Sequence, residues 1–215
     1  MSRVDLNDLN SQYVDVFKEL GNIGAGNAST ALAHMLNMKV DMSVPEVSLL
    51  EFKDAGSILG GEETIVCGVY LSVQGDITGS IMFLLDVSSA KKLTNKLMGI
   101  ESTTEGLDEM EGSALKEIGN IITSAYLNSL ATLTGLKILP SVPDLCIDMA
   151  GAILSVPAIE FGTVGDKILL IKNRFSEGLE GHFILVPDLE SYDTILSAIG
   201  MYRVHAVWGN LEFLI

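Results

Sequence analysis

Two short segments of the sequence carry the same polar residue types at the same spacing. In DVFKELGN and, 98 residues later, in SALKEIGN, an Asp or Ser is followed by Glu four positions on and by Asn three positions after that. These residues are Asp15, Glu19, Asn22, Ser113, Glu117 and Asn120. Residues at positions i, i+4 and i+7 lie on one stripe of an α-helix. The two segments therefore predict two helices, each with an acid and an amide along one face.

The Glu and Asn pair suits the positioning of reactants better than covalent attack. A carboxamide can hold a water molecule as donor or acceptor, and a Glu carboxylate can pair with a cation. The pair contains neither a nucleophile nor a complete metal site, so it needs a partner that carries the rest of the chemistry. Hydrolysis of a phosphoryl group needs little more, because its catalysis is largely positioning and charge neutralisation. A solvated helix face is the alternative interpretation, and at this point it stays open.

The elements that must position these residues are two long helices. Apolar side chains recur every three or four positions over residues 12–37 and again over residues 107–133. The first segment contains GNIGAGN, and each interior glycine costs about 1 kcal/mol relative to alanine, so a kink or restart is predicted at Gly24–Gly26. Ile122 and Ser124 take the corresponding positions in the second helix, which is expected to be straighter.

The segments after each helix read as strands. Pro45 and Pro143, again 98 residues apart, sit in β-like stretches, and each is followed by a short segment, two runs rich in β-branched residues and a closing amphipathic run. The order α-β-α-β-β-α therefore occurs twice. It predicts a layered α/β (α+β) fold with pseudo-two-fold symmetry, in which both halves contribute strands to a shared central sheet and two long helices bear the motif.

The repeat also defines the expected domain organisation. One domain spans residues 1–215, with internal repeats at about 10–100 and 106–201. Residues 202–215 form an apolar C-terminal extension with the single tryptophan, Trp208. We expect this extension to pack back on the domain, with an interface or a poorly ordered tail as the alternatives.

Composition excludes several classes of function. The chain has 28 acidic and 13 basic residues, a formal net charge of −15, which disfavours nucleic acids and anionic membranes as partners. No apolar run approaches the roughly 18 to 20 residues that span a bilayer, and no secretory signal precedes the first helix, so a cytoplasmic location is expected. Cys67 and Cys146 lack a CxxC arrangement and are expected to be buried, and the three histidines do not cluster, so no metal site is predicted.

Both copies of the motif resemble the pattern of the CheC, CheX and FliY family of phosphatases. That pattern is Asp or Ser, three residues, Glu, two residues, Asn, twenty-two residues and Pro, and each copy fits it completely. The similarity covers about residues 10–201. Two complete copies resemble the CheC branch of the family rather than the CheX branch, which retains one.

The resemblance implies hydrolysis of the aspartyl phosphate on the chemotaxis response regulator CheY. Asn22 and Asn120 would each orient the attacking water, and Glu19 and Glu117 would pair with a lysine of the regulator. Supporting positions of the motif are Asp15, Ser113, Pro45 and Pro143. The protein would need no cofactor of its own, because CheY would supply the Mg²⁺.

The family also implies a second partner, the receptor deamidase CheD. Its contact is expected near the short helix after the second proline, at Asp148, Met149 and Ile153. Two alternatives to a phosphatase keep the same fold. One is a module that binds phosphorylated receiver domains without hydrolysis, and the other is a regulatory partner of CheD with feeble activity of its own.

Overall fold

The protein is described by a computed structural model that covers residues 11–37, 39–51, 54–99, 106–161, 167–175 and 179–199. The expected C-terminal extension, including Trp208, lies outside these residues, so its packing stays a prediction. The helices are α1 (Ser11–Leu36), α2 (Ala55–Ile58), α3 (Val87–Met98), α4 (Glu109–Thr134), α5 (Ala150–Phe161) and α6 (Leu189–Ala198). The strands are β1 (Met42–Glu51), β2 (Ile65–Gly75), β3 (Gly79–Asp86), β4 (Ile138–Pro140), β5 (Asp144–Met149), β6 (Lys167–Phe175) and β7 (Glu180–Pro187).

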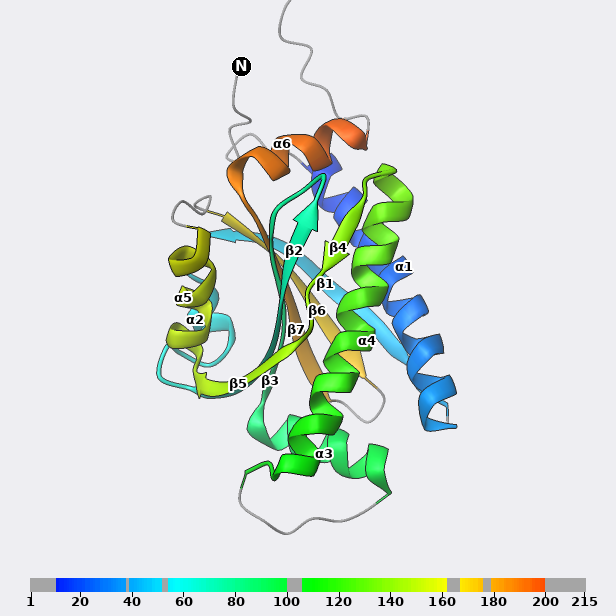
Figure 1. Cartoon of the computed structure of the whole chain (residues 1–215), viewed down its shortest axis with the longest axis vertical. Coiled ribbons are helices and arrows are strands. Elements are labelled where there is room, and N and C mark those ends of the chain that lie inside the picture. The colour runs from blue at the N-terminus through cyan, green and yellow to red at the C-terminus, as the bar shows by residue number, and fades with distance from the viewer. Residues whose placement is uncertain are drawn as a thin grey trace, which may run out of the picture.

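One antiparallel sheet lies at the centre of the molecule. Helices α1 and α4 cover one face of it, α2 and α5 lie on the other, and α3 and α6 lie at opposite ends (Figure 1). The strand order is β1-β6-β7-β3-β2-β4, and β5 also pairs with β2. This arrangement confirms the expected layered fold with a shared sheet.

The two halves of the chain exchange strands. β1, from the first half, pairs with β6 of the second, and β5, from the second half, pairs with β2 of the first. The hairpins β2–β3 and β6–β7 meet in the middle, where β3 pairs with β7. The pairing β1-β6-β7-β3-β2-β5 is therefore symmetric about the β3–β7 contact, as a pseudo-two-fold relation requires.

The central strands are buried on both faces. Successive side chains of a strand point to opposite faces, and in β3 Ile81 and Phe83 belong to the larger core with α1 and α4, whereas Met82 and Leu84 belong to the smaller core with α2 and α5. All four side chains are almost completely inaccessible to solvent. Burial on both faces explains why this segment reads as one continuous apolar run instead of an alternating pattern.

The predicted restart of the first helix is wrong. Helix α1 runs without interruption from Ser11 to Leu36. A Cβ atom added at Gly24 would lie 2.5 Å from Cδ1 of Tyr126 on α4, so this glycine lets the two helices approach closely. Asn27 adds a hydrogen bond from its Nδ2 to Oγ of Ser129, at 3.2 Å. Packing between α1 and α4 offsets the low helix propensity of the glycines.

The second long helix begins where its sequence predicts. Asp108 accepts a hydrogen bond from the Glu111 amide while the Glu111 side chain accepts one from the Asp108 amide, both at 2.8 Å, which is a capping box. Glu111 is completely buried and pairs with Lys91 of α3 at 3.2 Å. This cap fixes the end of α4 from which the second motif starts.

Candidate active site

Both copies of the motif lie on the outer surface of the long helices. On α1, Asp15, Glu19 and Asn22 are all exposed. On α4, the first two motif residues are exposed and Asn120 is partly exposed. Helices α1 and α4 cover the same face of the sheet (Figure 1), so both motif copies are carried by helices of one layer.

A buried glycine precedes each motif asparagine and brings its helix close to the sheet. A Cβ atom at Gly21 would lie 3.2 Å from Cγ1 of Val44, and one at Gly119 would lie 2.6 Å from Cβ of Val69. A larger side chain at Gly119 would force the helix or the strand to move, and one at Gly21 would crowd Val44. The glycines thus hold each asparagine at a fixed height above the sheet, which is the rigidity that a positioning residue needs.

The two prolines of the motif lie where the strand ladder is irregular or has not begun. Pro45 stands in β1 between Ser43 and Glu46, at a shift in the register with β6. Pro143 immediately precedes β5 and is partly exposed. Proline has no N–H to donate to a ladder, so these are the positions in which a strand tolerates it. The structure therefore gives the prolines a role in the backbone after each motif helix.

The surroundings of the two asparagines differ. Oγ of Ser124 donates to Oδ1 of Asn120 at 3.5 Å, a long hydrogen bond within one turn of α4. At the same position on α1 stands Gly26, where a Cβ atom would meet nothing within 4 Å. Asn22 has no hydrogen-bond partner among the described residues. The sequence places Ser124 four residues after Asn120, and this spacing was the signal for a contact that was not predicted.

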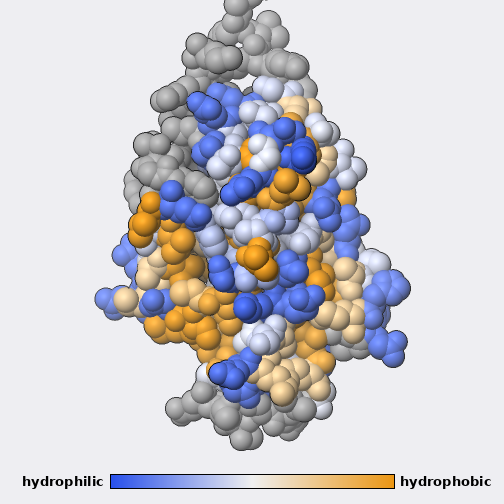
Figure 2. Space-filling model, viewed as in Figure 1, coloured by the Kyte–Doolittle hydropathy of each residue, from blue (hydrophilic) through white to orange (hydrophobic). Residues whose placement is uncertain are grey.

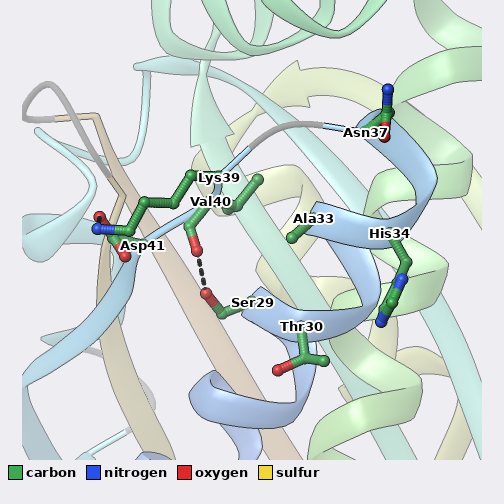
Figure 3. A pocket seen from close by; sticks show the side chains of 8 residues that line it. All are labelled: Ser29, Thr30, Ala33, His34, Asn37, Lys39, Val40 and Asp41. Atoms are coloured by element: carbon green, nitrogen blue, oxygen red, sulfur yellow. Dashed lines mark hydrogen bonds and ion pairs between the residues drawn. The ribbon is translucent and has the colours of Figure 1, made fainter.

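A surface hollow of about 490 Å³ opens beside the second copy of the motif. It lies between the first turns of α4 and strand β5, and Ser113 and Lys116 line it together with Asp108, Glu109 and Asp144. A second hollow, of about 540 Å³, lies at the other end of α1 and contains none of the motif residues (Figure 3). There Ser29 donates a hydrogen bond to the Val40 carbonyl and ties α1 to the segment that leads into β1.

The residues expected to contact CheD fall into two groups. Asp148 and Met149 end strand β5 and are exposed. Ile153 lies in the first turn of α5 with only 3% of its surface exposed, in the smaller core beside Gly68. Its expected role as a contact residue is therefore corrected, because α5 starts at Ala150 and turns Ile153 toward the sheet. The outward apolar side chains of α5 include Ile159, which is 77% exposed, and Val156, which is 36% exposed.

The two cysteines also differ from each other. Cys67 is buried, as predicted, and burial together with the nearby Asp86 carboxylate raises the pKa of its thiol to about 11. Cys146 is exposed, contrary to the prediction, because β5 lies at the edge of the sheet. In the described parts of the chain no three His, Cys, Asp or Glu residues are grouped as metal ligands would be. The source of the expected Mg²⁺ stays a prediction.

The outer surface near the motif is mostly polar. Figure 2 shows hydrophilic side chains over much of the middle of the face where α4 lies, and apolar side chains gathered toward α5 and β5. Exposed apolar residues on that side are Ile65, Ile147 and Met149. Among the described helices, none is long and apolar enough to cross a membrane.

Fold and site together define a class of protein, in which two helices related by pseudo-symmetry present exposed Glu and Asn pairs above a shared sheet. The same fold occurs in Thermotoga maritima FliY, with a TM-score of 0.73 and 24% identity over 90% of this chain and 98% of that one. It also occurs in the FliM–SpeE complex from H. pylori, with a TM-score of 0.67 and 13% identity over 92% of this chain and all of the matched one.

The sequence matches the CheC-like family over residues 15–49 and 110–147, which contain both copies of the motif. It is 35% identical to the CheY-P phosphatase CheC of Bacillus subtilis over 90% of this chain and 97% of that protein. It is 27% identical to the putative CheY-P phosphatase CheC1 of Halobacterium salinarum over 84% of this chain and 93% of that protein. The chain belongs to the CheC-like family.

Proposed function

We propose that the protein is a phosphatase that hydrolyses the aspartyl phosphate of the chemotaxis response regulator CheY. The observation that carries this proposal is the exposure of a complete Glu and Asn stripe on each long helix. Such stripes can enter a partner's phosphorylation site without any rearrangement of the fold. The relatives named as CheY-P phosphatases support the same substrate.

In the proposed reaction, Asn22 or Asn120 orients a water molecule toward the phosphorus atom. The water oxygen forms a bond to phosphorus while the bond from phosphorus to the aspartate oxygen breaks. The aspartate leaves as a carboxylate, the phosphoryl group leaves as inorganic phosphate, and the water protons pass to that phosphate and to solvent. Glu19 or Glu117 pairs with a lysine of CheY and fixes the orientation of the complex. The Mg²⁺ of CheY would neutralise phosphoryl charge, a task typical of metal ions in phosphoryl transfer.

The decisive test removes both amides. In the double variant Asn22→Ala with Asn120→Ala, we expect the acceleration of phosphate loss from CheY to fall by ~10² or more, because an oriented catalytic contact is lost at both sites. Each single variant should keep partial activity. The measurement is the decay of labelled phosphate on CheY, and circular dichroism checks that each variant folds.

Two results would change the proposal. A double variant as fast as the wild type would exclude the role of the asparagines. Tight binding of beryllofluoride-activated CheY without faster phosphate loss would favour a binding module instead of an enzyme.

CheD is the proposed second partner, and it is expected to contact the end of β5 and the adjacent part of α5. Met149→Glu should weaken the binding of CheD about tenfold or more, since a buried charge at an interface is costly. Leu139→Glu is the matched control, because Leu139 is similarly exposed on β4. Calorimetric titration measures both, and equal affinities for the two variants would place CheD elsewhere.

A further inference from the structure

Each copy of the motif contains a lysine that the proposed mechanism does not use. Lys18 and Lys116 are 98 residues apart, like the motif residues themselves, and each directly precedes the motif glutamate. Each lysine also stands four positions before the motif asparagine. Residues at i and i+4 are neighbours on a helix surface. Both long helices therefore present an ammonium group beside the exposed amide.

Neither motif lysine has a partner among the described residues, although the chain has a large excess of acidic side chains. Several other cations of the described residues hold carboxylates: Lys39 pairs with Asp41, Lys91 with Glu111, and Lys172 and Arg174 with Glu180. Lys18 and Lys116 have no ion pair or hydrogen bond within the described part of the chain. Lys116 is instructive, because three carboxylates line the same hollow and none of them pairs with it.

The charge of the chain gives these ammonium groups a function. With a net charge of −15, the protein repels an anionic partner at long range. The aspartyl phosphate of a receiver domain carries negative charge, so this repulsion acts on it too. A lone positive charge beside each amide creates a local attraction within about one Debye length, roughly 8 to 10 Å at physiological salt.

We propose that Lys18 and Lys116 are positioning residues that draw the anionic surface around the phosphoryl group of the receiver onto each Glu and Asn stripe. This proposal rests on the proposed function and deepens it. The lysines act in the binding of the receiver, and the asparagines orient the attacking water. Charges at the rim of an interface act mainly on the association rate and on its salt dependence. The lysines should therefore affect binding and KM much more than kcat.

The test compares two pairs of lysines with the same change in net charge. In Lys18→Ala with Lys116→Ala, the Kd for beryllofluoride-activated CheY and the KM for CheY-phosphate should each rise about five- to tenfold, with kcat within twofold of the wild type. The dependence of KM on salt should become flatter. In the control, Lys92→Ala with Lys137→Ala, both values should stay within twofold, because these two exposed lysines, likewise unpaired among the described residues, lie on α3 and after α4.

A third variant separates charge from length. Lys18→Arg with Lys116→Arg keeps both charges and should retain the wild-type Kd and salt dependence. Equal losses in the motif pair and the control pair would overturn the proposal, since net charge alone would then explain them. Unchanged Kd and KM in the motif pair, or a loss confined to kcat, would overturn it too. The Kd is measured without hydrolysis, so this outcome is independent of whether the asparagines prove catalytic.

Discussion

Helices α1 and α4 carry the same polar motif on their outer faces. At the contact between them, α1 has small residues where α4 has large ones. Gly24 of α1 lies against Tyr126 of α4, and the residues at the corresponding repeat positions are Ile122 of α4 and Ala28 of α1. All four are buried in one core. The space between two packed helices is fixed, so a large side chain on one requires a small one on the other. The repeat therefore preserves the exposed motif residues, whereas the residues at the contact between the helices have diverged.

The largest expected change in stability comes from filling the space that Gly24 leaves for Tyr126. Gly24→Ala should lower the free energy of unfolding by about 1–3 kcal/mol, because the new Cβ would meet the ring of Tyr126 and overpack the contact. That ring cannot move aside easily, since it stacks on Phe183 at 4.3 Å and donates a hydrogen bond to Asn173. Urea denaturation gives the value.

Gly26→Ala is the matched control two residues away. A Cβ at Gly26 meets nothing, so this variant should gain about 0.5–1 kcal/mol from better helix propensity. If Gly24→Ala were stabilising by a similar amount, the close approach of α1 to α4 would not be limited by that glycine.

The closing helices of the two repeats differ in their N-caps, and smaller effects are expected there. Asp86 accepts hydrogen bonds from the amide and hydroxyl of Ser89 and from the hydroxyl of Ser88. Asp188 accepts one from the amide of Ser191, whose hydroxyl accepts instead from the Thr78 amide. Asp86→Ala should cost about 1–2 kcal/mol of unfolding free energy and Asp188→Ala about 0.5–1. Equal costs would show that the extra hydroxyl bonds contribute nothing.

The Asp86 cap also predicts a dependence on pH. Burial by itself would raise the pKa of Asp86, but the hydrogen bonds from Ser89 and Ser88 outweigh it and lower the pKa. Because the pKa is lower in the folded state, the ionised carboxylate stabilises the fold at pH values above its ordinary pKa of about 3.9. This stabilisation is lost as the pH falls through the lower pKa of the folded state. The stability difference between wild type and Asp86→Asn should therefore be larger at pH 6 than at about pH 2.5. A constant difference would contradict this.

The smallest expected effect concerns the surroundings of the two motif asparagines. In an Asn22→Ala background, where only the second copy works, Ser124→Ala should lower kcat about threefold, because the Asn120 amide loses the hydroxyl that orients it. In an Asn120→Ala background, Gly26→Ser should raise kcat by a similar factor relative to Gly26→Ala. Phosphate-release kinetics at saturating CheY-phosphate measure both. No change in either background would mean that the 3.5 Å contact does not orient the amide.

The sequence predicted much of this fold because its repeat could be detected at a constant offset. Spacing predicted the two long helices with Glu19 and Glu117 on their polar stripes, and the repeated order of elements predicted the shared sheet. What it missed depends on contacts between distant segments. The continuity of α1 rests on Tyr126, which lies about a hundred residues away, and no local propensity reports it.

Two further errors have similar physical causes. The family resemblance assigned Ile153 to a partner surface without fixing the exact start of α5. That start decides which side chains face the sheet, because a shift of one residue turns a side chain by 100°. Cys146 was expected inside because a strand at the sheet edge has the same apolar composition as an inner strand. The role of each asparagine lies beyond the fold, since the phosphoryl group belongs to another protein.

The exchange of β1 and β5 constrains how the protein can change. In each half, the outer neighbour of the hairpin is a strand from the other half: β1 pairs with β6, and β5 pairs with β2. Deleting one half would strip the survivor of a border strand and expose a long apolar edge. A protein of this fold that needs only one motif copy is therefore expected to lose the other by point substitutions, while the half that carried it stays as part of the sheet.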